Sequence, residues 1–328
     1  LKTIQQEKLN NQVAELDVAT SENNIQESIA QVYIQILYAA ESVKVNESTL
    51  QVSIAQRDRG QELLNAGSIA KSDFAQLEAQ VSTDRYQLVT AQATLEDYKL
   101  QLKQLLELDG ENEMNIYLPA LSDENVLAPL PTKKDVYIRA LSLRPEIEAS
   151  KLNVEASELG IGIAKSSYLP TISLSAGIGT NHTSGSDFTF GEQVKNGWNN
   201  SIGLSVSVPI FNNRQTKSAV QKAKLQYETS MLSLLDEQKT LYKTIEGLWL
   251  DANSAQQRYA AANEKLKSTQ ISYELISEQF NLGMKNTIEL LTEKNNLLQA
   301  QQEQLQAKYM AILNMQLLKF YQGDQLAI

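Results

Sequence analysis

Apolar residues recur at intervals of seven along several long stretches of the chain. Such a heptad interval is typical of helices that pack side by side as coiled coils. Residues 3–66 contain no proline and a single glycine, Gly60, before the predicted turn, so they suit one long helix. Long helices are also predicted over 70–108, over 213–282 and after Gly283. The heptad residues are Val81, Leu88, Leu95 and Leu102, then Leu234, Leu241 and Leu248, then Leu291, Leu298, Leu305 and Ile312.

Two glycines interrupt this helical pattern at equivalent places. Gly67 follows Asn65, Gly283 follows Asn281, and the two glycines are 216 residues apart. An acid stands six residues after each of them, Asp73 in the first case and Glu289 in the second. Because glycine adopts the left-handed conformation that ends a helix, each stretch predicts the tip of a helical hairpin.

Two segments alternate with a period of two and predict strands. Each has an apolar face and a face of small polar residues, over about ten residues, which is the length that a tilted strand needs to cross a bilayer. A half-buried hairpin on a soluble sheet would give the same pattern. A polar loop containing Phe188, Phe190 and Trp198 separates the two segments. The apolar residues that we assign to the membrane are Ile172, Leu174, Ile178, Leu204, Val206, Val208 and Ile210.

The chain is therefore expected to be mainly α-helical with a small β part and an internal repeat. Long antiparallel helical hairpins are expected at 1–108 and 212–328. Between them we place a connector at 109–143, a helix leading to the strands at 144–168 and the strand hairpin at 169–211. Because the offset of 216 maps residue 1 onto Lys217, just after the second strand, we expect a helix and two strands to precede residue 1 in the full polypeptide.

The composition argues against several functions. The net charge is −10 without a basic cluster, which disfavours nucleic-acid binding. The chain has no cysteine and a single histidine, His182, so we expect no catalytic residue, no metal site and no cofactor. We also find no phosphate-binding glycine loop.

Taken in order, these segments resemble the TolC-type outer-membrane efflux channels over essentially the whole chain. The resemblance rests on the two tips, on "LRPEIEASKLNVEASELGIGIAKSSYLPTISLSAGIG" and on "GLSVSVPIF" before a long helix. It implies a homotrimer of the full-length protein whose helices form an α-barrel in the periplasm and whose strands lie in outer-membrane lipid of a Gram-negative bacterium. It further implies a passive, non-enzymatic exit duct that works with a periplasmic adaptor and an inner-membrane pump. The alternative is a periplasmic coiled-coil adaptor or scaffold, but adaptors have a single hairpin.

The resemblance also implies a gate near the tips. Lys285 falls on a basic position that pairs with an acid at Asp73, and Glu289 falls on an acidic ring that narrows the pore. Thr292 takes the place of a second acid and Phe280 that of a tyrosine, so one ring and one hydroxyl contact are expected to be missing. Ordinary solvated charges beside a hairpin tip would show the same residues. The candidate adaptor-docking residues are Leu63, Gly67, Leu282 and Gly283.

Overall fold

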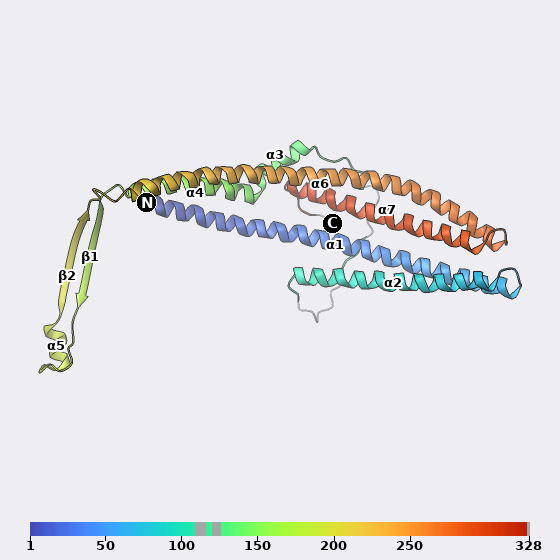
Figure 1. The fold of residues 1–328 in the computed structure, drawn as a ribbon, viewed down its shortest axis with the longest axis horizontal. Coiled ribbons are helices and arrows are strands. Elements are labelled where there is room, and N and C mark those ends of the chain that lie inside the picture. Colours follow the sequence, from blue (N-terminus) through green and yellow to red (C-terminus); the bar gives the residue numbers. More distant parts are fainter. Residues whose placement is uncertain (109–115, 120–125, 327–328) are drawn as a thin grey trace. The chain divides into compact units, whose positions relative to one another are not determined.

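Nine helices and strands are found in the residues that the computed structural model describes, which are 1–108, 116–119 and 126–326. The helices and strands predicted from heptads, glycines and alternation are confirmed within a few residues. Part of the predicted connector 109–143 lies outside the described residues. In chain order the elements in Figure 1 are α1 (Lys2–Asn65), α2 (Lys71–Leu105), α3 (Lys133–Leu143), α4 (Pro145–Ser166), β1 (Thr171–Gly179), α5 (Phe190–Asn196), β2 (Asn199–Ser207), α6 (Gln215–Asn281) and α7 (Thr287–Tyr321).

The chain divides into two compact units. The first comprises Leu1–Leu16 and Glu148–Asp236, and the second comprises Asp17–Ile147 and Glu237–Ile328. The first unit contains the strands, and the second contains both helical hairpin tips. Among the described residues, no helix combines the length and the apolar character needed to cross a membrane.

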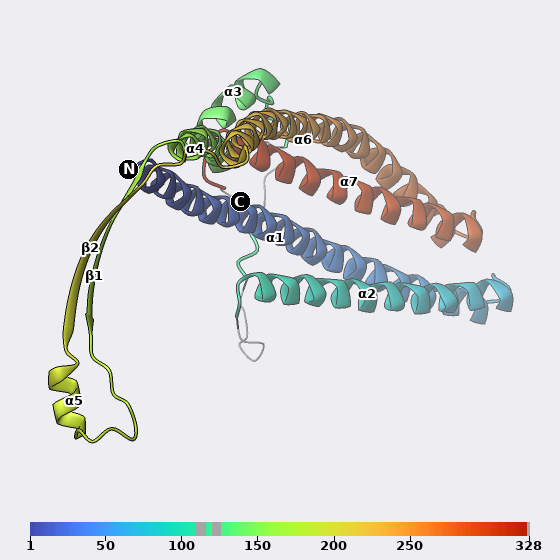
Figure 2. The ribbon, with the colours of Figure 1, turned by 60° about the vertical axis from the view of Figure 1, so that its left-hand side comes forward.

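The first unit carries an antiparallel strand pair, β1 and β2, with α5 in the connection between them (Figure 2). β2 ends at Ser207, so our placement of Val208 and Ile210 within the strand is wrong. Pro209 supplies the reason, because proline has no backbone N–H to donate to a neighbouring strand. The strand begins at Asn199.

The second unit contains two helical hairpins, α1 with α2 and α6 with α7 (Figures 1 and 2). On α2 the predicted heptad residues are buried or half-buried, as a coiled-coil seam requires. On α7 the predicted row from Leu291 is largely half-buried. A more deeply buried row lies one position earlier and includes Leu290, Leu297 and Leu318. The α7 helix is buried on a wide face because it contacts both α1 and α6.

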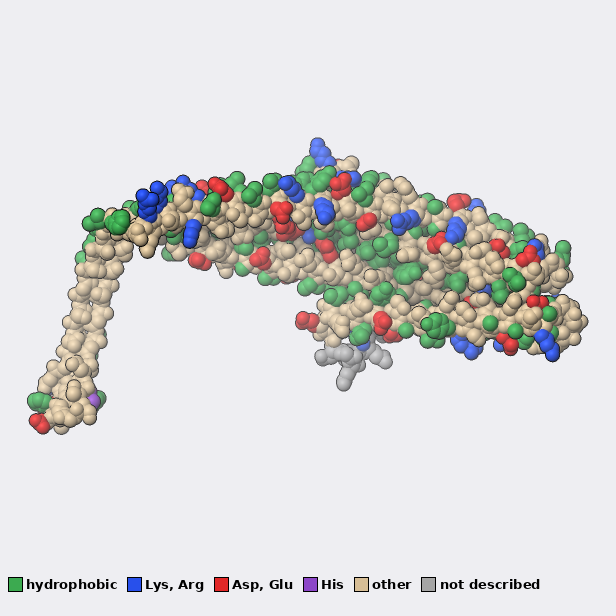
Figure 3. Space-filling view, viewed as in Figure 1, with side chains coloured by type: hydrophobic (Ala, Val, Ile, Leu, Met, Phe, Trp, Pro, Cys, Tyr) green, Lys and Arg blue, Asp and Glu red, His purple; other side chains and the backbone are tan. Residues whose placement is uncertain are grey.

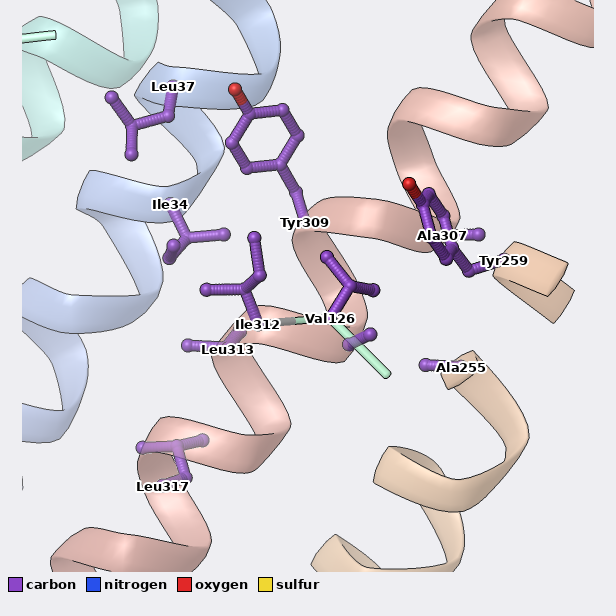
Figure 4. Close-up of a cluster of buried hydrophobic side chains, with 11 residues drawn as sticks. Ile34, Leu37, Val126, Ala255, Tyr259, Ala307, Tyr309, Ile312, Leu313 and Leu317 are labelled. Atoms are coloured by element: carbon purple, nitrogen blue, oxygen red, sulfur yellow. The ribbon is translucent and has the colours of Figure 1, made fainter. Parts of the chain in front are cut away.

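The largest apolar cluster of the second unit lies where α1, α6 and α7 approach one another. Figure 4 shows Ile34 and Leu37 of α1 facing Tyr309 and Ile312 of α7, with α6 supplying residues on the other side of α7. Val126 is fully buried between them. These contacts hold α1 of one hairpin against α6 and α7 of the other at this level.

A buried arginine, Arg144, pairs with acids of α1 and α4 at the start of α4, within the second unit. Arg144 Nη2 lies 3.1 Å from Glu27 Oε1, and its Nε lies 2.8 Å from Glu146 Oε1. The guanidinium also lies over the rings of Phe320 and Tyr321. Burial raises the pKa of the Tyr321 hydroxyl to about 12, with Glu27 contributing. The "LRPE" segment therefore joins α1, α4 and α7.

Candidate functional site: the hairpin tips and the strand hairpin

The first tip reverses the chain between α1 and α2 through a left-handed glycine. Gly67 has φ +73°. Its N–H donates to Leu64 O at 3.0 Å, and the next amide, of Ser68, donates to Leu63 O at 2.8 Å. This pair of bonds satisfies carbonyls that the end of a helix otherwise leaves unpaired.

The second tip repeats the first atom by atom. Gly283 has φ +74°, its N–H donates to Phe280 O at 2.9 Å, and Met284 N donates to Gln279 O at 2.8 Å. Each donor and acceptor lies 216 positions after its counterpart in the first tip. The internal repeat that the sequence predicted is therefore present in the backbone geometry of both turns.

The acid after each glycine caps the helix that follows. Asp73 Oδ2 accepts from Ala70 N at 3.3 Å, and Glu289 Oε2 accepts from Asn286 N at 3.2 Å. At the second tip the cap is reciprocal, because Asn286 Oδ1 accepts from Glu289 N at 2.9 Å. Both acids thus serve the start of a helix whatever else they do.

Lys285 pairs with Glu289 on its own helix end. Its Nζ lies 2.5 Å from Glu289 Oε1, with side-chain exposures of 32% and 40%. The hydrogen bond from Lys285, followed by that from the Asn286 backbone, lowers the pKa of the Glu289 carboxyl. Within the described chain Lys285 is paired with this acid and not with Asp73, so the Lys285–Asp73 contact stays a prediction.

A small apolar cluster holds the two tips against each other. Phe280 of α6 is 2% exposed and packs with Leu77 of α2 and Leu290 of α7. A hydrogen bond of 3.3 Å from Arg59 Nη2 to Asn281 O also crosses between the hairpins. Phe280 is therefore a core residue, in a place where a tyrosine hydroxyl would need a partner.

Several tip side chains stand free in solvent. Leu282 is 76% exposed and Met284 70%, while Ile288 on the first turn of α7 is also exposed. Leu63, by contrast, is half-buried against the Phe280 cluster. Thr292 is exposed, and its hydroxyl donates to Ile288 O at 2.8 Å. The sequence-based prediction included Leu282 but not Met284 and Ile288, which are also exposed.

The strand pairing places all the apolar side chains of the hairpin on one face. Across the pair, Ile172 is opposite Val206 and Leu174 is opposite Leu204. The opposite face carries serine, threonine, glycine and one asparagine. The side of the hairpin visible in Figure 3 shows no charged side chain along the strands. Leu174 is 76% exposed, so none of the described residues covers this apolar face.

The described fold is thus mainly α-helical, with two long helical hairpins that have matching tips and a small antiparallel strand hairpin. The model of the family "Outer membrane efflux protein" matches residues 136–323. The chain belongs to this family, and the predicted fold class is confirmed.

Known relatives agree with the assignment. The outer membrane efflux protein BepC of Brucella suis is 24% identical over 290 residues, covering 88% of this chain and 60% of the relative. TolC of Escherichia coli is 23% identical over 311 residues, covering 92% and 62%. The crystal structure of the CmeC outer membrane channel of Campylobacter jejuni has a TM-score of 0.80 at 19% identity, covering 100% of this chain and 68% of that one. The chain thus spans about 60% of the length of the curated relatives that it matches.

Proposed function

We propose that this chain is part of an outer-membrane channel of a tripartite efflux or export system. In this proposal it forms a passive exit duct for small molecules from the periplasm to the exterior and carries out no catalysis. The observation that supports it most is the register of β1 and β2, which gathers the apolar side chains on one uncovered face. The names of the relatives, among them outer membrane efflux proteins, support the same function.

The dimensions of the strand hairpin suit a bilayer. Each strand has 9 residues. At ~3.3 Å per residue such a strand is roughly 30 Å long, close to the thickness of the hydrocarbon core. A hairpin leaves two unpaired strand edges, which lipid does not tolerate, so neighbouring strands must pair with it. This need supports the homotrimer of the full-length protein.

The two tips are the proposed docking surface for a periplasmic adaptor, which would connect the duct to an inner-membrane pump. Gly67, Leu282 and Gly283 are exposed there, and Met284 and Ile288 enlarge the apolar part of the surface. Leu63 contributes mainly through its packing beneath the tip. The exposed apolar side chains support a protein partner, because water contact with them is unfavourable.

Glu289 is the proposed acidic ring of the gate. The hydrogen bond from Lys285 lowers the pKa of the Glu289 carboxyl. Three such carboxylates around a pore axis would favour cations. Lys285 forms an ion pair with Glu289 of the same chain and would reduce the negative potential of the ring. Asp73 is a second acid near the tips, and Thr292 adds no charge.

A pair of lysine substitutions in the full-length protein tests the membrane assignment. Leu174→Lys puts a charge near the middle of the apolar face, where lysine costs about 2–4 kcal/mol in a bilayer. Ser173→Lys, one residue earlier on the other face, is the matched control. We expect the first variant to lose most of its membrane-assembled protein and the second to retain it. Equal assembly of both variants would show that this face does not contact lipid.

Single-channel conductance in planar bilayers tests the gate. Glu289→Gln removes the charge but keeps a side chain that can cap α7. We expect this variant to lose the cation preference of the parent channel. We expect Lys285→Met to show a stronger cation preference than the parent, because the lysine charge no longer offsets the carboxylates. If both variants keep the ion selectivity of the parent channel, Glu289 does not form the ring. A parent protein that forms no pore at all would refute the channel itself.

A further inference from the structure

A buried charged cluster joins the two helical hairpins close to their tips. Lys294 of α7 contacts Asp84 of α2 and Ser53 of α1. The lysine and aspartate side chains are only 3% and 1% exposed, and Ser53 is 2% exposed. Three helices from both hairpins therefore meet at one ion pair.

The aspartate of this cluster has its hydrogen-bonding needs met. Asp84 Oδ2 accepts from Lys294 and from the Ser53 hydroxyl, and Oδ1 accepts from Gln80 Nε2 at 2.9 Å. Burial lowers the pKa of Lys294, and the contact with Asp84 acts in the opposite sense. Either charge would be costly without the other in this position.

The inward positions on either side of this pair are regularly spaced, and their spacing alone does not determine one alignment. On α2 the inward positions follow alternating steps of four and three, and on α7 they follow steps of three and four. The α2 positions are Leu77, Val81, Asp84, Leu88, Ala91, Leu95, Tyr98 and Leu102. The α7 positions near the tip are Thr287, Leu290, Lys294, Leu297 and Gln301. A shift of α7 along α2 by one heptad would again bring inward positions against inward positions.

The charged pair removes this ambiguity. After a shift of seven residues, Lys294 would face Leu77 or Ala91, and neither can accept a hydrogen bond from its ammonium group. Asp84 would then face Thr287 or Gln301 and lose its cationic partner. Only the observed alignment pairs the two buried charges among these neighbouring registers.

We propose that the Ser53–Asp84–Lys294 cluster is a register lock that fixes α7 against the first hairpin. A single polar position in an apolar seam is known to select one register at some expense of stability. The lock sets the two tips level with each other, so that Arg59 of α1 reaches Asn281 at the second tip. The proposal does not require the channel function, although level tips would matter for adaptor docking.

Thiol cross-linking of the full-length protein measures the register directly, because the described chain has no cysteine of its own. Gln80 Nε2 lies 3.5 Å from Asn295 Oδ1, so Gln80→Cys with Asn295→Cys reports the observed register. Gln87→Cys with Asn295→Cys and Gln80→Cys with Gln302→Cys report shifts of one heptad in either direction. A shift of seven residues moves the positions about 10 Å apart. A short bismaleimide then distinguishes the registers.

With the lock intact, we expect the first cysteine pair to react about a hundredfold more than the shifted pairs. The reason is that each shifted register leaves two buried charges unpaired, which is strongly destabilising. The variant Asp84→Leu with Lys294→Leu should keep its helix content but raise the yield of the shifted pairs about tenfold or more. The reversed pair, Asp84→Lys with Lys294→Asp, should restore the observed register.

Three results would overturn the proposal. The first is an apolar variant that still cross-links only in the observed register. The second is loss of helix content in that variant, because a register lock does not supply the stability of the seam. The third is a reversed pair that yields shifted products. A protein that proves to form no pore leaves this cross-linking pattern unaffected, so the two proposals fail separately.

Discussion

Phe280 fills the space between the two hairpin tips, and its removal should allow them to separate locally. The side chain is 2% exposed, and its neighbours Leu77 and Leu290 are 1% and 0% exposed. Phe280→Ala removes a fully buried ring, and such changes cost about 3–5 kcal/mol when the cavity cannot collapse. Because Leu77 and Leu290 belong to different hairpins, this energy is lost mainly from the contact between the tips.

Hydrogen exchange of the full-length protein measures this loss. At about 1.4 kcal/mol per tenfold change, a cost of about 3–5 kcal/mol corresponds to opening that is roughly 10²- to 10⁴-fold more frequent. We expect amides in the last turns of α6 and the first turns of α7 to exchange faster by that factor. Met284→Ala is the matched control, since Met284 is 70% exposed on the same turn. Exchange in Phe280→Ala that equals that of the parent protein would refute the role of the ring.

Two further predictions concern the turns and the charges beside them. Gly67→Ala and Gly283→Ala force a β-carbon into φ near +73° and +74° and should each destabilise the protein by about 1–2 kcal/mol. Gly247→Ala in the interior of α6, where nothing lies within 4 Å of the added carbon, should stabilise it by about 1 kcal/mol; thermal melts that rank these variants otherwise contradict the account. Lys285 lowers the pKa of Glu289 below its ordinary value of 4.5. The contribution of this ion pair to stability is therefore complete above pH 4.5 and is lost as the pH falls through the lower pKa of the folded state. Circular dichroism against pH should show this loss in the parent protein and a smaller one in Glu289→Gln, and identical curves would exclude the pair as the cause.

The long helices and their turns could be predicted from the sequence because their signals are local. The heptad spacing and a glycine followed by an acid appear twice, and each turn is closed by bonds within a few residues. The sequence also contained a signal for the end of β2, because Pro209 follows directly after Val208. The strand alternation was correct in face but overextended by giving apolar character more weight than the missing N–H of proline.

The partners of charged residues could not be predicted in the same way. The sequence alone does not decide whether Lys285 pairs with Asp73 or with Glu289. In the structure it pairs with Glu289, four residues later, which is the spacing that brings side chains together on one helix face. Asp84 and Lys294 are 210 residues apart and look like ordinary surface charges until α2 and α7 are placed together. The available signal was that Asp84 lies three residues after Val81 in the heptad seam, where a charge is unusual.

The central claim is that the alternating face of β1 and β2 contacts lipid, and a labelling scan along β1 tests it most directly. Single cysteines from Thr171 to Gly179 in the full-length protein, each carrying a nitroxide label, can be relaxed by oxygen from lipid or by a nickel complex from water. We predict that labels at Ile172, Leu174 and Ile178 respond to oxygen and that those at Ser173 and Ser175 respond to nickel. Equal response to the nickel complex at every position would contradict the account.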